Sequence, residues 1–132
     1  MTPQTIFNLS ISGLIKQGKQ AINSEGRCQY RAPDGSKCAV GLLIQDEHYL
    51  ADSESLEVTD KSYTQSSDPV YLMCKASGID LESRPIRDLL MDLQIMHDDY
   101  FMSMHNRESF VEYIERKSFY IAEKHALTPL AV

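Results

Sequence analysis

The sequence predicts an α+β fold that is mainly helical, with four to five helices around a small β-hairpin. Apolar residues recur at helical spacing in several segments, which indicates amphipathic helices. A capping residue followed by proline marks two helix starts, at 2–3 and at 68–69. The turn sequence APDG at 32–35 lies between two short arms and indicates the hairpin. A length of 132 residues fits a single domain spanning 1–132.

The N-terminal helix is expected over residues 3–17. Thr2 is a good N-cap, and the proline that follows it suits the first helical position. Gly18 supplies the C-terminal stop, because glycine adopts the left-handed conformation that ends many helices. The apolar face of this helix recurs every three or four positions and consists of Phe7, Ile11, Leu14 and Ile15.

The central stretch, 28–49, combines the hairpin with a short apolar run. The run at 39–44 is too apolar to be exposed, and we expect a short buried helix there, entered at residue 36 or 37. A buried strand is the alternative. Gly41 within a helix would cost about 1 kcal/mol relative to alanine. We therefore expect another backbone segment to approach closely at this glycine.

A polar segment and a short helix follow. Residues 51–68 are rich in serine, threonine and aspartate, which predicts a long loop with one short strand at 56–58. A helix over 70–77 is expected to end at Gly78.

Two longer helices complete the domain. The first begins at Ser83, and its apolar stripe extends from Ile86 to Tyr100. Asn106 is expected to cap the last helix. Residues 128–132 form a tail, because the proline within them cannot continue a helix.

Composition and charge argue against several classes of protein. The net charge of −6 argues against direct DNA binding, which needs a basic surface. No apolar span of about eighteen residues indicates a membrane helix, and the N-terminus lacks the features of a signal peptide. Three cysteines, an odd number, fit a reducing compartment better than a disulfide scaffold. These features predict a cytoplasmic protein with no membrane segment.

Cys28 and Cys38 lie on opposite arms of the expected hairpin. They could be buried thiols, a reversible disulfide or part of a metal site. A zinc site usually contains two cysteines separated by only two to four residues. Nine residues separate these two. We expect buried thiols here, with no metal and no cofactor.

Cys38 is also a candidate nucleophile of a thiol-dependent enzyme. At the start of the expected 39–44 helix and beside Lys37, its thiol would have a lowered pKa. His97 would then act as the base, oriented by Asp98. The alternative is that the cysteine and the histidine are both core residues.

Cations in the central stretch define a candidate ligand site. Arg27, Arg31 and Lys37 could hold an anion or the phosphate of a nucleotide. The ring of Tyr30 or Tyr49 could stack on a base. The alternative is a solvated charged face whose arginines pair with nearby acids.

An apolar corner at 100–104 defines a candidate partner surface. A helix cannot bury so many neighbouring apolar residues on one face, and methionine and aromatic residues suit adaptable interfaces. With the 51–68 loop, this corner is the face we expect to bind a protein. Core packing at a helix–helix corner is the alternative for its residues Tyr100, Phe101, Met102 and Met104.

Two motifs carry a resemblance. Residues 28–49 follow the pattern CxYRxPDGxKCAVGxLIxDExY, and residues 93–98 follow LQxxHD. In these motifs the chain resembles a family of small uncharacterised proteins of tailed phages and prophages. The chain departs from the family pattern at Leu42 and Gln45, where relatives carry a small residue or cysteine and a proline. The resemblance implies an accessory phage protein in the host cytoplasm and assigns no residue a role.

The leading functional expectation is a non-enzymatic protein that binds and inhibits or modulates a host or defence protein. It rests on the acidic charge, the missing catalytic signature and the phage resemblance. One alternative is a sponge that captures a nucleotide or a phosphorylated small molecule. The other is the thiol-dependent enzyme.

Overall fold

The computed structural model describes residues 1–55, 60–100 and 108–130, and the regular secondary structure within these ranges is helical. Its α-helices are α1 (Pro3–Gln17), α2 (Pro69–Ala76), α3 (Arg84–Asp98) and α5 (Phe110–Lys124). Single turns of 3₁₀-helix form η1 (Gly41–Leu43), η2 (Asp46–His48), η3 (Ala51–Ser55) and η4 (Asp60–Tyr63). No β-strand occurs in the described ranges, so the α+β prediction is wrong.

The expected hairpin is replaced by a loop with isolated contacts. The predicted turn at 32–35 is present, because the Gly35 N–H donates to the Ala32 carbonyl at 3.0 Å and Gly35 has φ +90°. Beyond it, one antiparallel bridge joins Arg31 to Lys37, and a second isolated bridge lies at the base of the loop. The two arms never form a ladder.

The pairing stops at Tyr30, whose N–H would face Cys38 across the loop but donates to a side chain instead. The N–H groups of Arg31 and Lys37 face away from the opposite arm and are also taken by side chains. The N–H groups of Tyr30 and Arg31 donate to the carboxylate of Glu54, at 2.7 and 2.9 Å. The N–H of Lys37 donates to the side-chain oxygen of Gln17 at 2.8 Å. A backbone N–H that already has a partner cannot extend a β-ladder.

The predicted helix starts agree with the structure where capping residues are described. Thr2, Asp68 and Ser83 accept hydrogen bonds from backbone N–H groups in the first turns of α1, α2 and α3. The helix expected over 39–44 is wrong, since only η1 forms there. The strand expected at 56–58 and the cap expected at Asn106 lie outside the described residues; the cap of α5 is Ser109.

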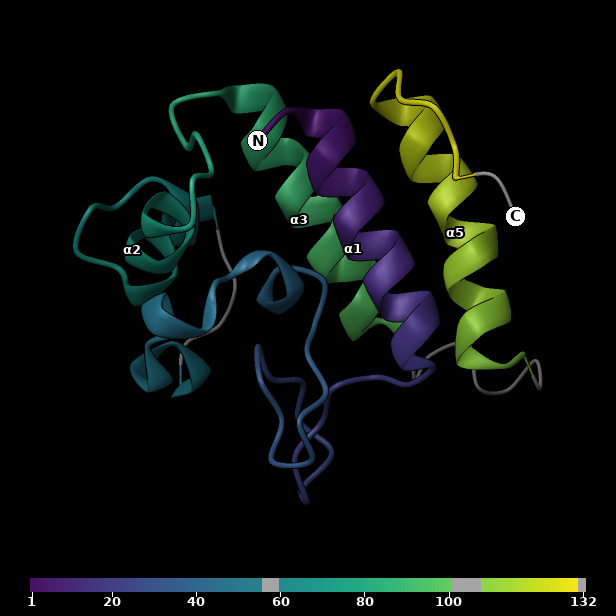
Figure 1. Cartoon of the computed structure of the whole chain (residues 1–132), viewed down its shortest axis with the longest axis horizontal. Coiled ribbons are helices and arrows are strands. Elements are labelled where there is room, and N and C mark those ends of the chain that lie inside the picture. Colours follow the sequence, from purple (N-terminus) through teal and green to yellow (C-terminus); the bar gives the residue numbers. More distant parts are fainter. Residues whose placement is uncertain (56–59, 101–107, 131–132) are drawn as a thin grey trace.

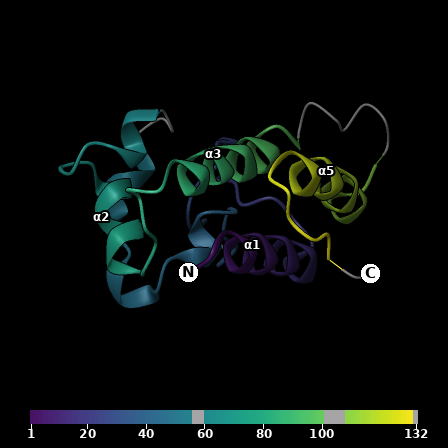
Figure 2. The same cartoon turned by 90° about the horizontal axis from the view of Figure 1, so that it is seen from above.

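Three helices form the centre of the molecule. Figure 1 shows α1 and α3 running in the same direction and α5 running in the opposite one. Viewed from above, α3 and α5 form one layer and α1 lies beneath both of them (Figure 2). The short helix α2 packs with η3 and η4 to one side. None of the described helices has the length and apolar character that crossing a bilayer requires.

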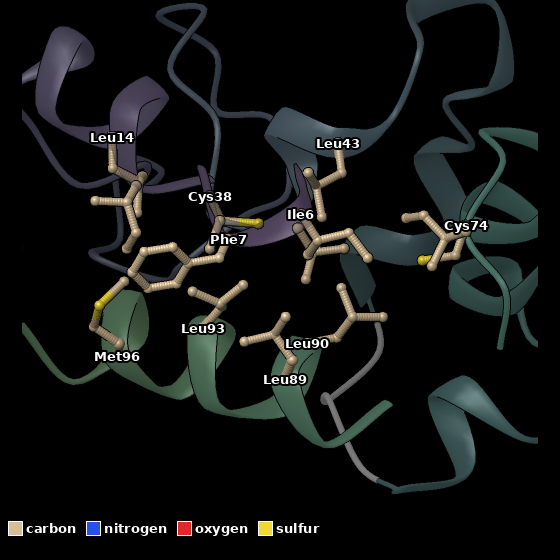
Figure 3. Close-up of a cluster of buried hydrophobic side chains, with 14 of the residues drawn as sticks. Ile6, Phe7, Leu14, Cys38, Leu43, Cys74, Leu89, Leu90, Leu93 and Met96 are labelled. Atoms are coloured by element: carbon tan, nitrogen blue, oxygen red, sulfur yellow. The ribbon is translucent and has the colours of Figure 1, made fainter. Parts of the chain in front are cut away.

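The core lies between α1 and α3. Figure 3 shows Phe7 of α1 above Leu93 and Met96 of α3, with the Cys38 side chain beside it. All four side chains are buried. The loop that follows α1 therefore contributes its apolar run to the same core as the helices. This contact places the central stretch against α3.

At Gly41 the backbone of this loop lies very close to another part of the same loop. A Cβ atom at this position would lie 2.1 Å from the carbonyl oxygen of Tyr30. The close backbone approach predicted from the sequence is confirmed. Gly13 offers a contrast, because a Cβ there would meet only the side chain of Leu42, whose methyl groups lie at 2.8 and 3.0 Å.

Replacing Gly41 should therefore destabilise the protein strongly. We expect Gly41→Ala to lower the free energy of unfolding by more than about 2 kcal/mol, because backbone atoms must move to admit the methyl group. Gly13→Ala is the matched control and should stay within about 1 kcal/mol of wild type, since a flexible leucine can move and alanine favours the helix. Urea unfolding followed by circular dichroism measures both. Equal effects of the two substitutions would contradict the close approach of the Tyr30 carbonyl to Gly41.

Candidate functional site

The loop that contains the predicted ligand-binding residues binds the side-chain carboxylate of Glu54. Glu54 comes from η3, and its Oε1 accepts the Tyr30 N–H at 2.7 Å. Its Oε2 accepts the Arg31 N–H at 2.9 Å and the Tyr49 hydroxyl at 2.6 Å. Adjacent backbone N–H groups that converge on one anion form a nest, a common oxyanion-binding arrangement. We call Tyr30, Arg31, Tyr49 and Glu54 the carboxylate nest.

The guanidinium of Arg31 borders the carboxylate nest. It lies 4.7 Å from the centre of the Tyr49 ring, donates from Nη2 to the Ile44 carbonyl at 2.9 Å and pairs through Nη1 with Asp46 at 2.8 Å. Lys37 also reaches Asp46, at 3.5 Å, and the Asp46 side chain is 84% exposed. The Nε atom of Arg31 is buried and has no hydrogen-bond partner among the residues that the structure describes. The Nε–H is therefore a donor without an acceptor in this part of the structure.

The structure brings together four of the five residues predicted to bind a ligand. Tyr30, Arg31 and Tyr49 surround the Glu54 carboxylate, and Lys37 adjoins them through Asp46. The fifth, Arg27, is largely exposed and pairs with Glu25 at 3.8 Å. Tyr30 is only 4% exposed, so its ring is not available to stack on a base.

A second polar cluster joins the loop to the end of α3. One ligand-type atom each from Cys28, His97 and Asp98 lies within 4.8 Å of the others. His97 is fully buried. Its Nε2 accepts the Ala21 N–H at 3.0 Å, and its Nδ1 lies 2.8 Å from the Asp98 carboxylate.

These contacts fix the tautomer of His97. Because a backbone N–H can only donate, Nε2 must be the acceptor, and the ring proton lies on Nδ1, facing Asp98. A metal ion at Nδ1 would need that nitrogen deprotonated and Nε2 protonated, which would turn Nε2 against the Ala21 N–H. The donors and acceptors present thus fit a buried hydrogen-bond network better than a metal site.

Cys38 does not pair with His97. Its sulfur accepts the Gly41 N–H at 3.2 Å, and both ring nitrogens of His97 already have other partners. Burial raises the pKa of the Cys38 thiol, the opposite of what a nucleophile needs. Gln94 links the neighbours of the two residues, because it accepts the Val40 N–H at 3.3 Å and donates to Asp98 at 3.0 Å.

The other cysteines are also free, unactivated thiols in the described structure. No disulfide joins Cys28 to Cys38. Burial, with the charge of Asp98 next, raises the pKa of Cys28 to about 12. Burial raises the pKa of Cys74 to about 12 as well. All three thiols remain protonated at neutral pH.

The predicted partner surface is only partly described. Phe101, Met102 and Met104 lie outside the described residues. The Tyr100 ring packs edge-on against Phe110 with 5.0 Å between centroids, and its hydroxyl donates to the Glu108 carbonyl at 3.2 Å. Tyr100 thus fits the core-packing alternative. The 51–68 segment also contributes to the interior through buried residues, namely Ser53, Ser62 and Tyr63.

A groove between α3 and α5 was not predicted from the sequence. It has a volume of about 390 Å³. Ile95 and Tyr120 on its walls are 47% and 62% exposed. At one end Lys124 and His125 pair with Asp92, at 2.9 and 2.6 Å. The other lining residues are Met96, Asp99, Tyr113, Lys117 and Ile121.

The adjacent aromatic residues at 119 and 120, of which Tyr120 lines the groove, are the sequence feature that could have indicated this surface. The apolar stripe of α5 does not include these two positions, and both side chains are at least half exposed. A large exposed aromatic residue outside the buried stripe of a helix often marks a contact surface.

Comparison with protein families, with curated proteins and with solved structures gave no match for this chain. The phage-family resemblance drawn from the two motifs therefore stays a prediction.

The raised thiol pKa values predict slow alkylation. At neutral pH the native protein should react with iodoacetamide far more slowly than the same protein unfolded in urea, because only the thiolate attacks and burial also blocks access. Mass spectrometry of tryptic peptides reports each cysteine separately. Rapid modification of Cys38 in the native protein would contradict its placement in the core.

The hydrogen bonds of His97 predict a graded mutational response. His97→Ala leaves the Ala21 N–H and the Asp98 carboxylate without this partner and should lower the free energy of unfolding by about 3 kcal/mol. His97→Gln can keep an acceptor facing Ala21 and should cost less. His48→Ala is the control and should change little, because it removes a partly exposed histidine whose ion pair with Glu47 spans 3.7 Å. One equivalent of zinc in purified protein, lost in His97→Ala, would contradict the assigned tautomer.

Proposed function

We propose that this chain is a non-enzymatic protein that binds and inhibits or modulates a host or defence protein in a bacterial cytoplasm. The observation that carries the proposal is the α3–α5 groove with its exposed apolar side chains. The acidic charge and the phage resemblance supply the biological context.

The groove has the shape and chemistry that suit a helix. Its walls are two antiparallel helices, and its apolar lining includes Ile95 and Tyr120. An amphipathic helix commonly binds by placing its apolar face in such a groove. A partner helix here would add a fourth helix, on the side of the α3–α5 layer away from α1.

The charges at the groove define the partner further. Asp92 and Asp99 lie on the α3 side, and Lys117 and Lys124 lie on the α5 side. Among the described residues, no ion pair engages Asp99 or Lys117, so this end of the groove can pair with a ligand. A complementary helix would carry a basic residue facing α3 and an acidic residue facing α5.

The thiol-enzyme alternative has less support. It requires a lowered thiol pKa and a histidine within hydrogen-bond reach of the sulfur. Cys38 is buried with a raised pKa, and His97 is engaged by Ala21 and Asp98. The core position of Cys38 accounts for it without any catalytic role.

A groove substitution should weaken partner binding. Tyr120→Glu places a charge on the rim of the groove without disturbing the core, since this side chain is 62% exposed. We expect it to weaken binding at least about tenfold, the effect typical of losing an aromatic interface residue. The measurement is affinity purification from bacterial lysate followed by titration of the purified partner.

Leu9→Glu is the matched control, because Leu9 is an exposed apolar residue of α1, outside the groove, and is 47% exposed. It should bind like wild type. Equal binding by Tyr120→Glu would place the partner on another surface, and the absence of any enriched protein would argue against the proposed function itself.

A further inference from the structure

We propose that the carboxylate nest is a binding site for the phosphate group of a small ligand, and that Glu54 occupies it as an internal competitor. This site is separate from the α3–α5 groove and independent of the proposed protein partner. Its ligand class is a phosphate monoester, recognised by backbone N–H groups, a tyrosine hydroxyl and flanking cations.

The donors of the nest already hold an oxyanion. Two adjacent N–H groups and one phenol converge on the two oxygens of Glu54 at 2.6 to 2.9 Å. Backbone donors provide the same field whatever anion occupies them, and charge-assisted bonds of this length are strong. An external oxyanion of similar size can therefore replace the glutamate with little change in the loop.

The cations that border the nest favour phosphate over a second carboxylate. The Nε atom of Arg31 is buried, and no described residue accepts a hydrogen bond from it. Among the described residues, the ion pair of the Lys37 ammonium is the 3.5 Å contact with Asp46, whose side chain is 84% exposed. A carboxylate has two oxygens and one charge, whereas a phosphate monoester has three terminal oxygens and up to two charges. The additional charge suits a site bordered by the Arg31 guanidinium and, through Asp46, by the Lys37 ammonium.

The position of Glu54 makes exchange feasible. The glutamate belongs to the short helix η3 and is partly exposed, and Tyr49 beside it is also partly exposed. A tethered carboxylate has a high effective concentration, so it lowers the apparent affinity for any external ligand. Removing the glutamate should unmask the site.

The test is a phosphate titration followed by the backbone amide NMR signals of Tyr30 and Arg31. We expect both signals to shift in Glu54→Ala and in the nearly isosteric Glu54→Gln, with an affinity at least about tenfold higher than in wild type. Inorganic phosphate is the probe, and a parallel titration with acetate tests whether a carboxylate binds instead. Phosphate should also raise the melting temperature of Glu54→Ala more than that of wild type.

Glu47→Ala controls for the loss of one negative charge, because the Glu47 side chain is 74% exposed and its ion pair is with His48, outside the nest. It should respond to phosphate as wild type does. The inference is overturned if the two amides do not respond in either Glu54 variant, or if both variants unfold and phosphate does not restore them. Stronger rescue of Glu54→Ala by acetate than by phosphate would overturn the phosphate assignment.

Discussion

The need to satisfy backbone N–H groups without a β-sheet shapes the central part of this protein. The segment between α1 and η1 crosses the core region with isolated bridges only, yet a buried amide that lacks a partner costs about 1–3 kcal/mol. Helix side chains supply acceptors. Gln17 of α1 accepts the Lys37 N–H, and His97 and Gln94 of α3 accept those of Ala21 and Val40. These bonds attach the loop to both helices.

The same principle explains which parts of the fold could be predicted. Helix starts depend on local chemistry, so Thr2, Asp68 and Ser83 identify α1, α2 and α3 correctly. The turn at 32–35 is equally local. The hairpin prediction failed because the Tyr30 N–H, which would have continued the pairing, donates to Glu54, a residue distant in sequence. The residue pattern within the arms contains no information about a hydrogen-bond partner so far away in the sequence.

The candidate sites divide in a similar way. The residue types of the ligand site were visible in the sequence, and four of its five members lie together. The anion that they bind, Glu54, could not be recognised from the sequence, because an acidic residue in a polar segment looks like any solvent-exposed charge. The α3–α5 groove depends on how two helices pack, which the stripe of each helix alone does not determine.

The side chain-to-backbone attachment also has a consequence for sequence variation. A backbone N–H is the same in almost every residue, so the loop positions that donate, such as Ala21 and Val40, are restricted mainly by size and packing. The accepting side chains Gln17, Glu54, Gln94 and His97 have no such freedom, since each needs an acceptor at a fixed reach. Among related sequences, the positions whose backbone donates should therefore vary, whereas the positions whose side chains accept should stay the same. The two sets of positions should show little pairwise covariation.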